Sequence, residues 1–269
     1  MVTRERIKKT IQALRLLDDD FLVQVFDQNI EGLNLLLNIF LGRSDMEVIE
    51  VTAQREYKNV GGRSVRLDLF AKDSSGKVYD IEVQRADKGA VSRRAQYYSS
   101  MLDTKLLNTG DDFSALVDSY VIFITEHDVM GEGLPLYHIR RIVEETGRAF
   151  GDGTHILYVN AAYEDNTSPI GKLMHDFRCT SADEMNYTQL AEKVRYFKET
   201  EGGQETMCRL IEELINEEKQ ESRREAVHET QIQNALNMIE AGRLTYEEIA
   251  EYSGLPLDEV KKLALGRTA

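Results

Sequence analysis

Acidic and amide side chains occupy alternate positions in two short apolar segments near residue 75. Asp68 lies in the segment VRLDLF, and Glu82 and Gln84 lie in the segment VYDIEVQ. The period-two alternation of apolar and polar residues predicts β-strands whose polar side chains share a face. Two carboxylates held close together would offer Mg²⁺ the hard oxygen ligands that it prefers. A solvated strand face that only carries charge would explain the same pattern.

The predicted turn between these strands decides how they pair. Residues 74–76 read Ser-Ser-Gly, and a three-residue loop with its glycine in the left-handed conformation is a common hairpin connection. This loop places Asp68 opposite Glu82, with their Cβ atoms about 5 Å apart. A slip of one residue would separate the two acids, so the register is a test of the metal hypothesis. Asp80, nearer the turn, is interpreted as a solvated residue.

Basic residues surround this predicted hairpin. Residues 51–100 carry ten Lys and Arg against six Asp and Glu, although the whole chain has a formal net charge of −14. The overall charge argues against a general polyanion binder. The local excess of positive charge would neutralise phosphates of a bound substrate. The basic residues closest in sequence to the two acids are Arg63, Arg66, Arg85, Lys88, Arg93 and Arg94.

The remaining patterns predict an α/β fold with an α-helical C-terminal tail. The segment SYVIFIT at 119–125 is nearly all apolar, which is typical of a strand covered on both faces. A glycine pair at 61–62 predicts a break. Further strands are expected over 47–59, 134–143 and 154–163, and helices over 4–17, 30–41, 88–107, 169–178 and 186–199.

Three regions are expected along the chain: a domain over 1–200, a charged helical connector over 201–226 and a small helical unit over 227–269. Breaks at Gly242 and Gly254, with Thr245 as an N-cap, divide the last unit in the manner of a helix-turn-helix or of any three-helix unit. Acidic residues occupy the positions at which a DNA-reading helix carries Lys or Arg. This unit is therefore interpreted as a protein-contact unit, such as one for homo-oligomer assembly, or as a weak DNA reader. Its expected core is Leu244, Ile249, Ala250, Leu255, Val260 and Leu263.

Composition places the chain among cytoplasmic proteins. The charged N-terminal segment lacks the apolar region of a signal peptide, and no apolar run reaches the roughly 18 residues of a membrane span. The two cysteines, Cys179 and Cys208, match no metal or redox spacing. The five histidines form no pair at i,i+4, so scattered structural histidines are favoured over a zinc site.

Several segments together resemble the PD-(D/E)XK nuclease superfamily. The match is closest to its nuclease-family transposases, which are related to the recombination-promoting nucleases, and it covers most of residues 15–200. The resemblance implies a restriction-endonuclease-like core, in which helices flank a central mixed β-sheet, and DNA cleavage dependent on Mg²⁺ or a similar cation such as Mn²⁺. The segments are LDDDFLVQVF, LDLF, DIEVQ, RRAQYYSSMLD, YVIFITEHDVMGEGLPLYHI, ILYVNAAY and IGKLMHDF.

The family pattern falls on particular residues of this chain. It implies that Asp68 and Glu82 coordinate the metal, helped by the backbone carbonyl of Val83. Gln84 stands where the superfamily usually carries lysine, and glutamine can neither act as a base nor carry charge. The transposase branch commonly has glutamine there, and the implied role of Gln84 is to position a metal-activated water for attack on phosphorus.

Arg66, Arg85 and Arg94 are the candidates for binding substrate phosphate, because they are basic neighbours of the two acids. Arg94 and Tyr97 also match the family's helix after the site. They share a helix face, and Tyr97 serves equally well in packing. Some superfamily members add an acid from the first helix, for which Asp20 is the candidate, with a helix N-cap as the alternative.

Three functions therefore compete. The first is a metal-dependent DNA endonuclease. The second is a catalytically weak or inactive module that binds DNA or protein on a nuclease scaffold, which Gln84 and the net charge favour. The third is a structural or regulatory module that does not bind nucleic acid, which an absence of salt-sensitive DNA binding would favour.

Overall fold

The computed structural model describes residues 4–59, 63–86 and 89–266. The chain divides into two compact units, residues 1–205 and 206–269. The predicted glycine break at 61–62 lies outside the described residues. Throughout the three described ranges, every helix lacks the long apolar sequence that a bilayer crossing requires.

A six-stranded mixed sheet forms the centre of the first unit, with strand order β1-β2-β3-β4-β8-β5. Strands β1, β2 and β3 pair antiparallel, β3, β4 and β8 pair parallel, and β5 pairs antiparallel with β8. This is the mixed sheet that the sequence predicted. The strands are β1 (Val48–Tyr57), β2 (Val65–Asp73), β3 (Val78–Gln84), β4 (Ser119–Thr125), β5 (Leu136–Ile139) and β8 (Thr154–Asn160).

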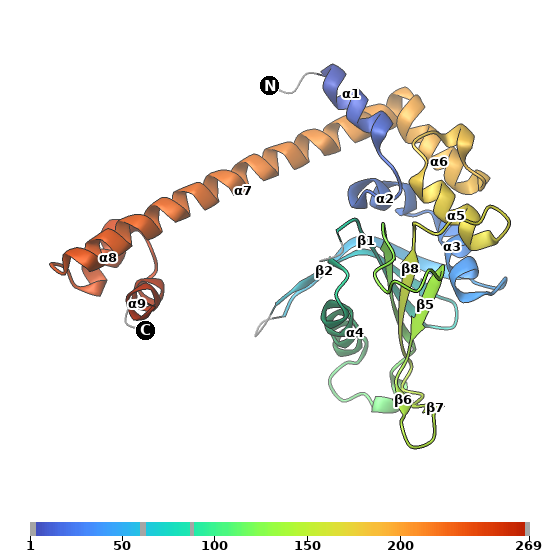
Figure 1. Cartoon of the computed structure of the whole chain (residues 1–269), viewed down its shortest axis with the longest axis horizontal. Helices are drawn as coiled ribbons and strands as arrows, with labels where there is room; N and C mark the ends of the chain where they lie inside the picture. Colours follow the sequence, from blue (N-terminus) through green and yellow to red (C-terminus); the bar gives the residue numbers. More distant parts are fainter. Residues whose placement is uncertain (1–3, 60–62, 87–88, 267–269) are drawn as a thin grey trace. The chain divides into compact units, whose positions relative to one another are not determined.

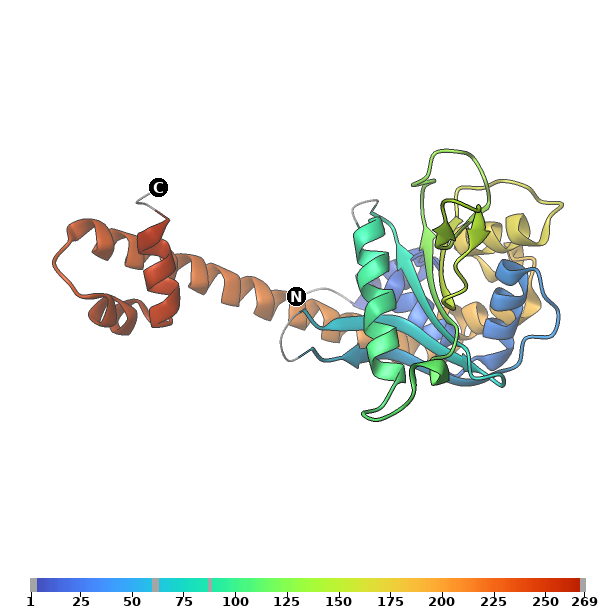
Figure 2. The same cartoon turned by 90° about the horizontal axis from the view of Figure 1, so that it is seen from below.

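Helices cover both faces of this sheet (Figures 1 and 2). Helix α4 (Ser92–Leu106) lies across one face, whereas α2 (Asp19–Phe26) and α3 (Ile30–Leu41) lie on the other. Every residue of β4 is buried, which confirms that this strand is covered on both sides. The remaining helices of the unit are α1 (Arg4–Ala13), α5 (Pro169–Arg178) and α6 (Thr188–Glu199), with short 3₁₀ turns at Phe113–Ala115 and Ala182–Glu184.

The strand predicted over 134–143 is correct in part, because this segment forms two short strands and not one. Only β5 joins the sheet from this segment, and the chain then leaves it to form a separate two-stranded ribbon of β6 (Ile142–Val143) and β7 (Arg148–Ala149). The hydrogen bond from the Phe150 amide to the Arg141 carbonyl continues this ribbon beyond its two strands. The sequence showed one apolar run here, but apolar periodicity does not say which partner a strand pairs with.

The hairpin of β2 and β3 has the predicted register. Leu69 pairs with Ile81 and Phe70 with Asp80, and Gly76 in the turn has φ of 89°. The turn is closed by a hydrogen bond from the Asp73 amide to the Lys77 carbonyl. Continuing this register by one residue beyond the Leu69–Ile81 pair places Asp68 opposite Glu82, as the sequence predicted.

A buried lysine ties the N-terminal segment to α6. The Lys198 side chain is 2% exposed, and its Nζ atom donates to the carbonyls of Gln12, Leu14 and Thr180. Two of these acceptors lie at the end of α1, where helix carbonyls lack partners within the helix. A single side chain therefore holds together segments more than 180 residues apart in sequence.

We expect Lys198→Met to lower the free energy of unfolding by about 3 kcal/mol, because the methionine leaves buried carbonyls without donors. Chemical denaturation would measure this change. The matched control is Lys9→Met on α1, whose side chain is 79% exposed, and it should change stability by less than about 0.5 kcal/mol. Equal effects from the two variants would contradict the structural role of Lys198.

The second unit contains the C-terminal part of α7 (Glu201–Ala241), α8 (Tyr246–Ser253) and α9 (Leu257–Leu265). Thr245 and Glu248 form a capping box at the start of α8, and Gly242 and Gly254 have positive φ, so the predicted breaks are correct. Ile249, Leu255 and Val260 are buried with Ala235 in its core. Because α7 continues unbroken through residue 226, the predicted connector boundary stays a prediction.

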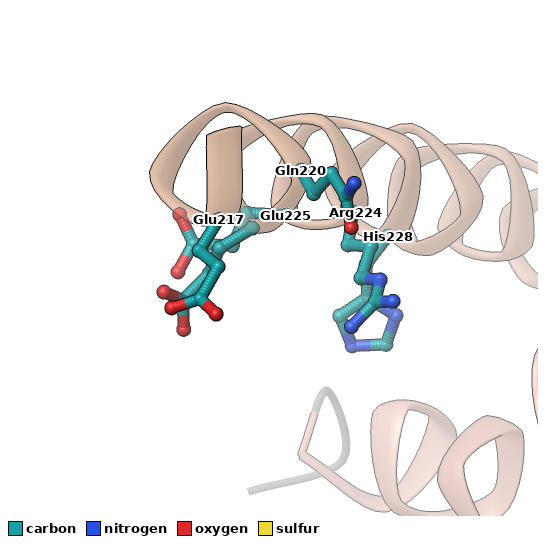
Figure 3. A pocket seen from close by; sticks show the side chains of 6 residues that line it. Glu217, Gln220, Arg224, Glu225 and His228 are labelled. Atoms are coloured by element: carbon teal, nitrogen blue, oxygen red, sulfur yellow. The ribbon is translucent and has the colours of Figure 1, made fainter. Parts of the chain in front are cut away.

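A charged pocket lies on α7 within this second unit. Figure 3 shows Glu217 and Glu225 on one side of this pocket and Arg224 and His228 on the other. His228 Nε2 lies 3.1 Å from Glu259 Oε1 of α9. The lining consists only of charged and amide side chains, as expected of a solvated helix surface. Its residues are Glu217, Gln220, Glu221, Arg224, Glu225 and His228.

Candidate active site

In the hairpin, the carboxyl groups of Asp68 and Glu82 each accept a hydrogen bond from a backbone amide of the opposite strand. Glu82 Oε1 accepts a hydrogen bond from the Asp68 amide at 2.9 Å. Asp68 Oδ2 accepts one from the Val83 amide at 3.3 Å. Each carboxyl is therefore held by the backbone of the opposite strand, and a change of register would break both bonds at once. We call these two residues the acid pair.

Arg94 supplies the positive charge closest to the acid pair. Its Nη2 atom lies 2.7 Å from Glu82 Oε2 and also donates to the Tyr98 hydroxyl, while Nη1 donates to the Gly89 carbonyl. The guanidinium lies over the rings of Tyr98 and Phe123, with its Cζ atom 4.8 Å and 5.7 Å from their centroids. Several contacts therefore fix Arg94 against Glu82 from the α4 side of the sheet.

Burial dominates the electrostatics of the acid pair. It raises the pKa of Asp68 to about 6, an effect opposed by the hydrogen bond from Val83 and reinforced by the negative charge of Asp19. Burial also raises the pKa of Glu82 to about 8, and the negative charge of Asp68 adds to this shift. A bound divalent cation would favour the ionised form of both groups.

The interpretation of Asp80 as a solvated residue is wrong. Asp80 is fully buried, and neither of its carboxyl oxygens has a hydrogen-bond partner among the described residues. It lies between Phe70 of β2 and Val121 of β4. Burial raises its pKa well above the usual range, and the charge of Glu82 adds to the effect. The prediction failed because β3 is an interior strand covered by α4, so its polar face is closed to solvent.

A family model for the PD-(D/E)XK nuclease family transposases matches residues 25–168. This span covers more than half of the chain and includes the acid pair, Arg94 and the hairpin that positions them. The chain belongs to this family. No curated protein and no solved structure was found to match it.

The mixed sheet of this nuclease-family transposase agrees with the restriction-endonuclease-like core that the sequence predicted. Family membership supports a nuclease or transposase type of function, for which DNA is the implied substrate.

Gln84 and Val83 complete the end of β3 in this transposase-family chain. Gln84 shares its strand face with Glu82 and is partly exposed, whereas Val83 points to the opposite face and is buried. The backbone of Gln84 is held by the Glu126 amide, which donates to its carbonyl at 3.1 Å. The Gln84 side chain therefore lies at the solvent-accessible end of the strand that carries Glu82.

The predicted phosphate-binding arginines have different surroundings. Arg66 is exposed on β2, and its positive charge lowers the pKa of Asp68 slightly against the larger effect of burial. Arg85 forms ion pairs with Asp18 at 2.6 Å and Glu126 at 3.1 Å, so a phosphate contact by Arg85 stays a prediction. The same holds for Arg94, which binds Glu82. Arg63 and Arg93 are exposed, and Lys88 lies outside the described residues.

Helix α2 brings a different acid toward the site than the sequence suggested. The N-cap is Asp18, and its side chain accepts from the Arg15 amide without capping the helix. Asp20 is the second residue of α2, so the N-cap alternative for Asp20 is wrong. Asp19 is the residue whose charge acts on Asp68. Participation of Asp20 in the site stays a prediction.

Sequence reasoning missed a cluster of possible metal ligands near the end of α5. His175, Asp176 and Cys179 have ligand atoms within 4.8 Å of one another, and the i,i+4 spacing of His175 and Cys179 was the available signal. Asp176, however, accepts hydrogen bonds from the amides of Asn186 and Tyr187. These bonds attach α5 to the start of α6, which explains the buried acid without a metal.

Proposed function

We propose that this protein is a DNA endonuclease that depends on Mg²⁺ or a similar cation such as Mn²⁺. The carrying observation is the acid pair, in which the register of the hairpin brings the buried carboxyl of Glu82 together with the partly exposed carboxyl of Asp68. Membership in the nuclease-family transposases supports the reaction class. Asp68, Glu82 and the Val83 carbonyl are the proposed metal ligands.

The donor set suits a hard divalent cation. Carboxylate and carbonyl oxygens are the ligands that Mg²⁺ prefers, and it usually keeps several waters and binds substrate phosphates as well. Asp68 is partly exposed, so the pair opens toward solvent on one side. Burial raises the pKa values of Asp68 and Glu82 despite their hydrogen bonds and the nearby Arg94, and a bound cation would favour their ionised forms. When bound, the cation would activate water and stabilise charge on the phosphate.

The surrounding residues have distinct proposed tasks. Arg94 holds the Glu82 carboxylate in one orientation through its Nη2 atom. Gln84 can orient a water by hydrogen bonds to its amide, but it cannot take up the proton of that water. Arg66, exposed on β2, is the proposed contact for a substrate phosphate because its positive charge acts on Asp68 and no ion-pair partner is found for it among the described residues.

A plasmid-nicking assay tests this function directly. We expect the purified protein to nick supercoiled DNA in Mg²⁺ or Mn²⁺ and to lose this activity in EDTA, with activity restored by added cation. Nicking that is unaffected by EDTA would show that the activity does not belong to the proposed site.

Arg66→Gln should weaken DNA binding and reduce the salt dependence of that binding, since one phosphate contact is lost.

A second candidate is a DNA-binding protein without cleavage activity on the same scaffold. It is favoured by the uncharged Gln84 and by the ion pairs that already engage Arg85 and Arg94. Salt-sensitive DNA binding without cation-stimulated nicking would support this candidate. Assembly through the C-terminal helices remains a separate expectation, which the molar mass of the full chain in solution would check.

A further inference from the structure

The Gln84 side chain occupies space that is open only because residue 89 is glycine. A Cβ atom on Gly89 would overlap Oε1 of Gln84 and would lie 2.9 Å from its Cδ atom. Real Cβ atoms do not approach other heavy atoms this closely, so any larger residue at 89 must move the Gln84 amide. The carboxamide of Gln84 is thus packed directly against the Gly89 backbone.

Arg94 holds Gly89 in a defined place relative to the acid pair. Its Nη1 atom donates to the Gly89 carbonyl at 3.0 Å, and its Nη2 atom donates to Glu82 Oε2 at 2.7 Å. The Gly89 amide in turn donates to the Ala86 carbonyl at 2.8 Å. One planar guanidinium therefore links the backbone that supports Gln84 to the carboxylate of Glu82.

From this geometry we infer that Gly89 is a positioning residue that seats the Gln84 carboxamide beside Glu82. This inference rests on the proposed function, in which Gln84 orients the attacking water. An amide that can rotate freely would present its donor and acceptor atoms in many directions. The Gly89 surface and the Arg94 link restrict that freedom, so the Gln84 amide is already oriented when substrate arrives.

The variant Gly89→Ala tests the inference cleanly. Gly89 is not among the glycines with positive φ, so alanine fits its backbone, and the displaced atoms belong to the end of a flexible side chain. We expect an unchanged or slightly higher melting temperature. Metal-dependent nicking should fall about 10- to 100-fold, because displacing a positioned group by about 1 Å has effects of this size.

Two further measurements separate positioning from a general structural effect. When Gln84 has already been replaced by alanine, Gly89→Ala should cause no further loss of nicking activity, since the side chain that it displaces is absent. The side-chain amide resonance of Gln84, assigned by its loss in Gln84→Ala, should shift in Gly89→Ala. The matched control is Gly202→Ala, where the new Cβ would meet Tyr196 Oη at an ordinary 3.6 Å, and it should leave nicking and the resonance unchanged.

The outcomes distinguish this inference from the proposed function. Wild-type activity in Gly89→Ala, or an unshifted Gln84 resonance, overturns the role of Gly89 while leaving the endonuclease intact. Additive losses in the double variant overturn it as well. If the wild-type protein does not nick DNA under any cation, the proposed function fails, and the Gln84 resonance alone then decides whether Gly89 seats the amide.

Discussion

Asp68→Asn and Glu82→Gln are each expected to reduce metal-dependent nicking about 1,000-fold. Each change keeps the size of the side chain but removes a negative charge from the proposed metal centre. Losing metal-assisted stabilisation of the transition state costs several kcal/mol, and about 4 kcal/mol corresponds to this factor. Initial rates of plasmid nicking over a range of Mg²⁺ concentrations would measure the loss and show whether added cation recovers any activity.

The two variants also test the acid pair as a unit. Because both side chains would bind one cation, the double variant should be little worse than either single variant. The matched control is Glu56→Gln, which removes an exposed acid from the neighbouring strand β1 and should keep full activity. Retention of nicking by both single variants, in preparations free of other nucleases, would falsify the site assignment.

Without divalent cations, raising the pH from 5.5 to 8.5 should lower the free energy of unfolding by roughly 3 kcal/mol. Burial raises the pKa of Asp68 to about 6 and that of Glu82 to about 8, whereas an unfolded chain would have values of about 4. Between pH 4 and these raised pKa values, the folded protein keeps protons on the two carboxyls that the unfolded chain has already released. The free energy of unfolding therefore falls as the pH rises through about 6, where Asp68 ionises, and about 8, where Glu82 ionises.

Chemical denaturation in EDTA at several pH values would measure this slope. The combined variant Asp68→Asn with Glu82→Gln should flatten it, and Asp80→Asn should raise stability at pH 8.5 by replacing a buried acid with a neutral group of the same shape. Adding Mg²⁺ should stabilise the wild-type protein more at pH 8.5 than at pH 5.5, since a cation competes with protons for the same oxygens. A wild-type slope of the opposite sign would show that other groups dominate.

Local sequence signals predicted the hairpin because its determinants are local. The three-residue turn with Gly76 sets the register, and alternation then assigns Asp68 and Glu82 to one face. The helices over 30–41 and 169–178 and the strand over 119–125 were predicted with the bounds that they have. In each of these segments, residue pattern and tertiary environment favour the same structure.

Features that depend on distant contacts were not predictable in the same way. The burial of Asp80 depends on α4 covering β3, and the partners of Arg85 include Asp18, 67 residues earlier in the chain. The packing of Gln84 against Gly89 produces no periodic pattern in the sequence, because a glycine at position 89 indicates only a turn. Alternation showed which side chains share a face, but it could not show what covers that face.

The hydrogen bonds that join Asp68, Glu82 and Arg94 come from one short stretch of chain. The hydrogen bond between the Asp68 amide and Glu82 spans 14 residues, and the Arg94 contact with Glu82 spans 12. Loop closure over such distances costs little entropy compared with pairing β3 to β4 or β4 to β8. Low contact order favours early formation during folding. We therefore expect the acid pair and its arginine to assemble before the parallel half of the sheet, so that cations can influence the folding rate as well as the final stability.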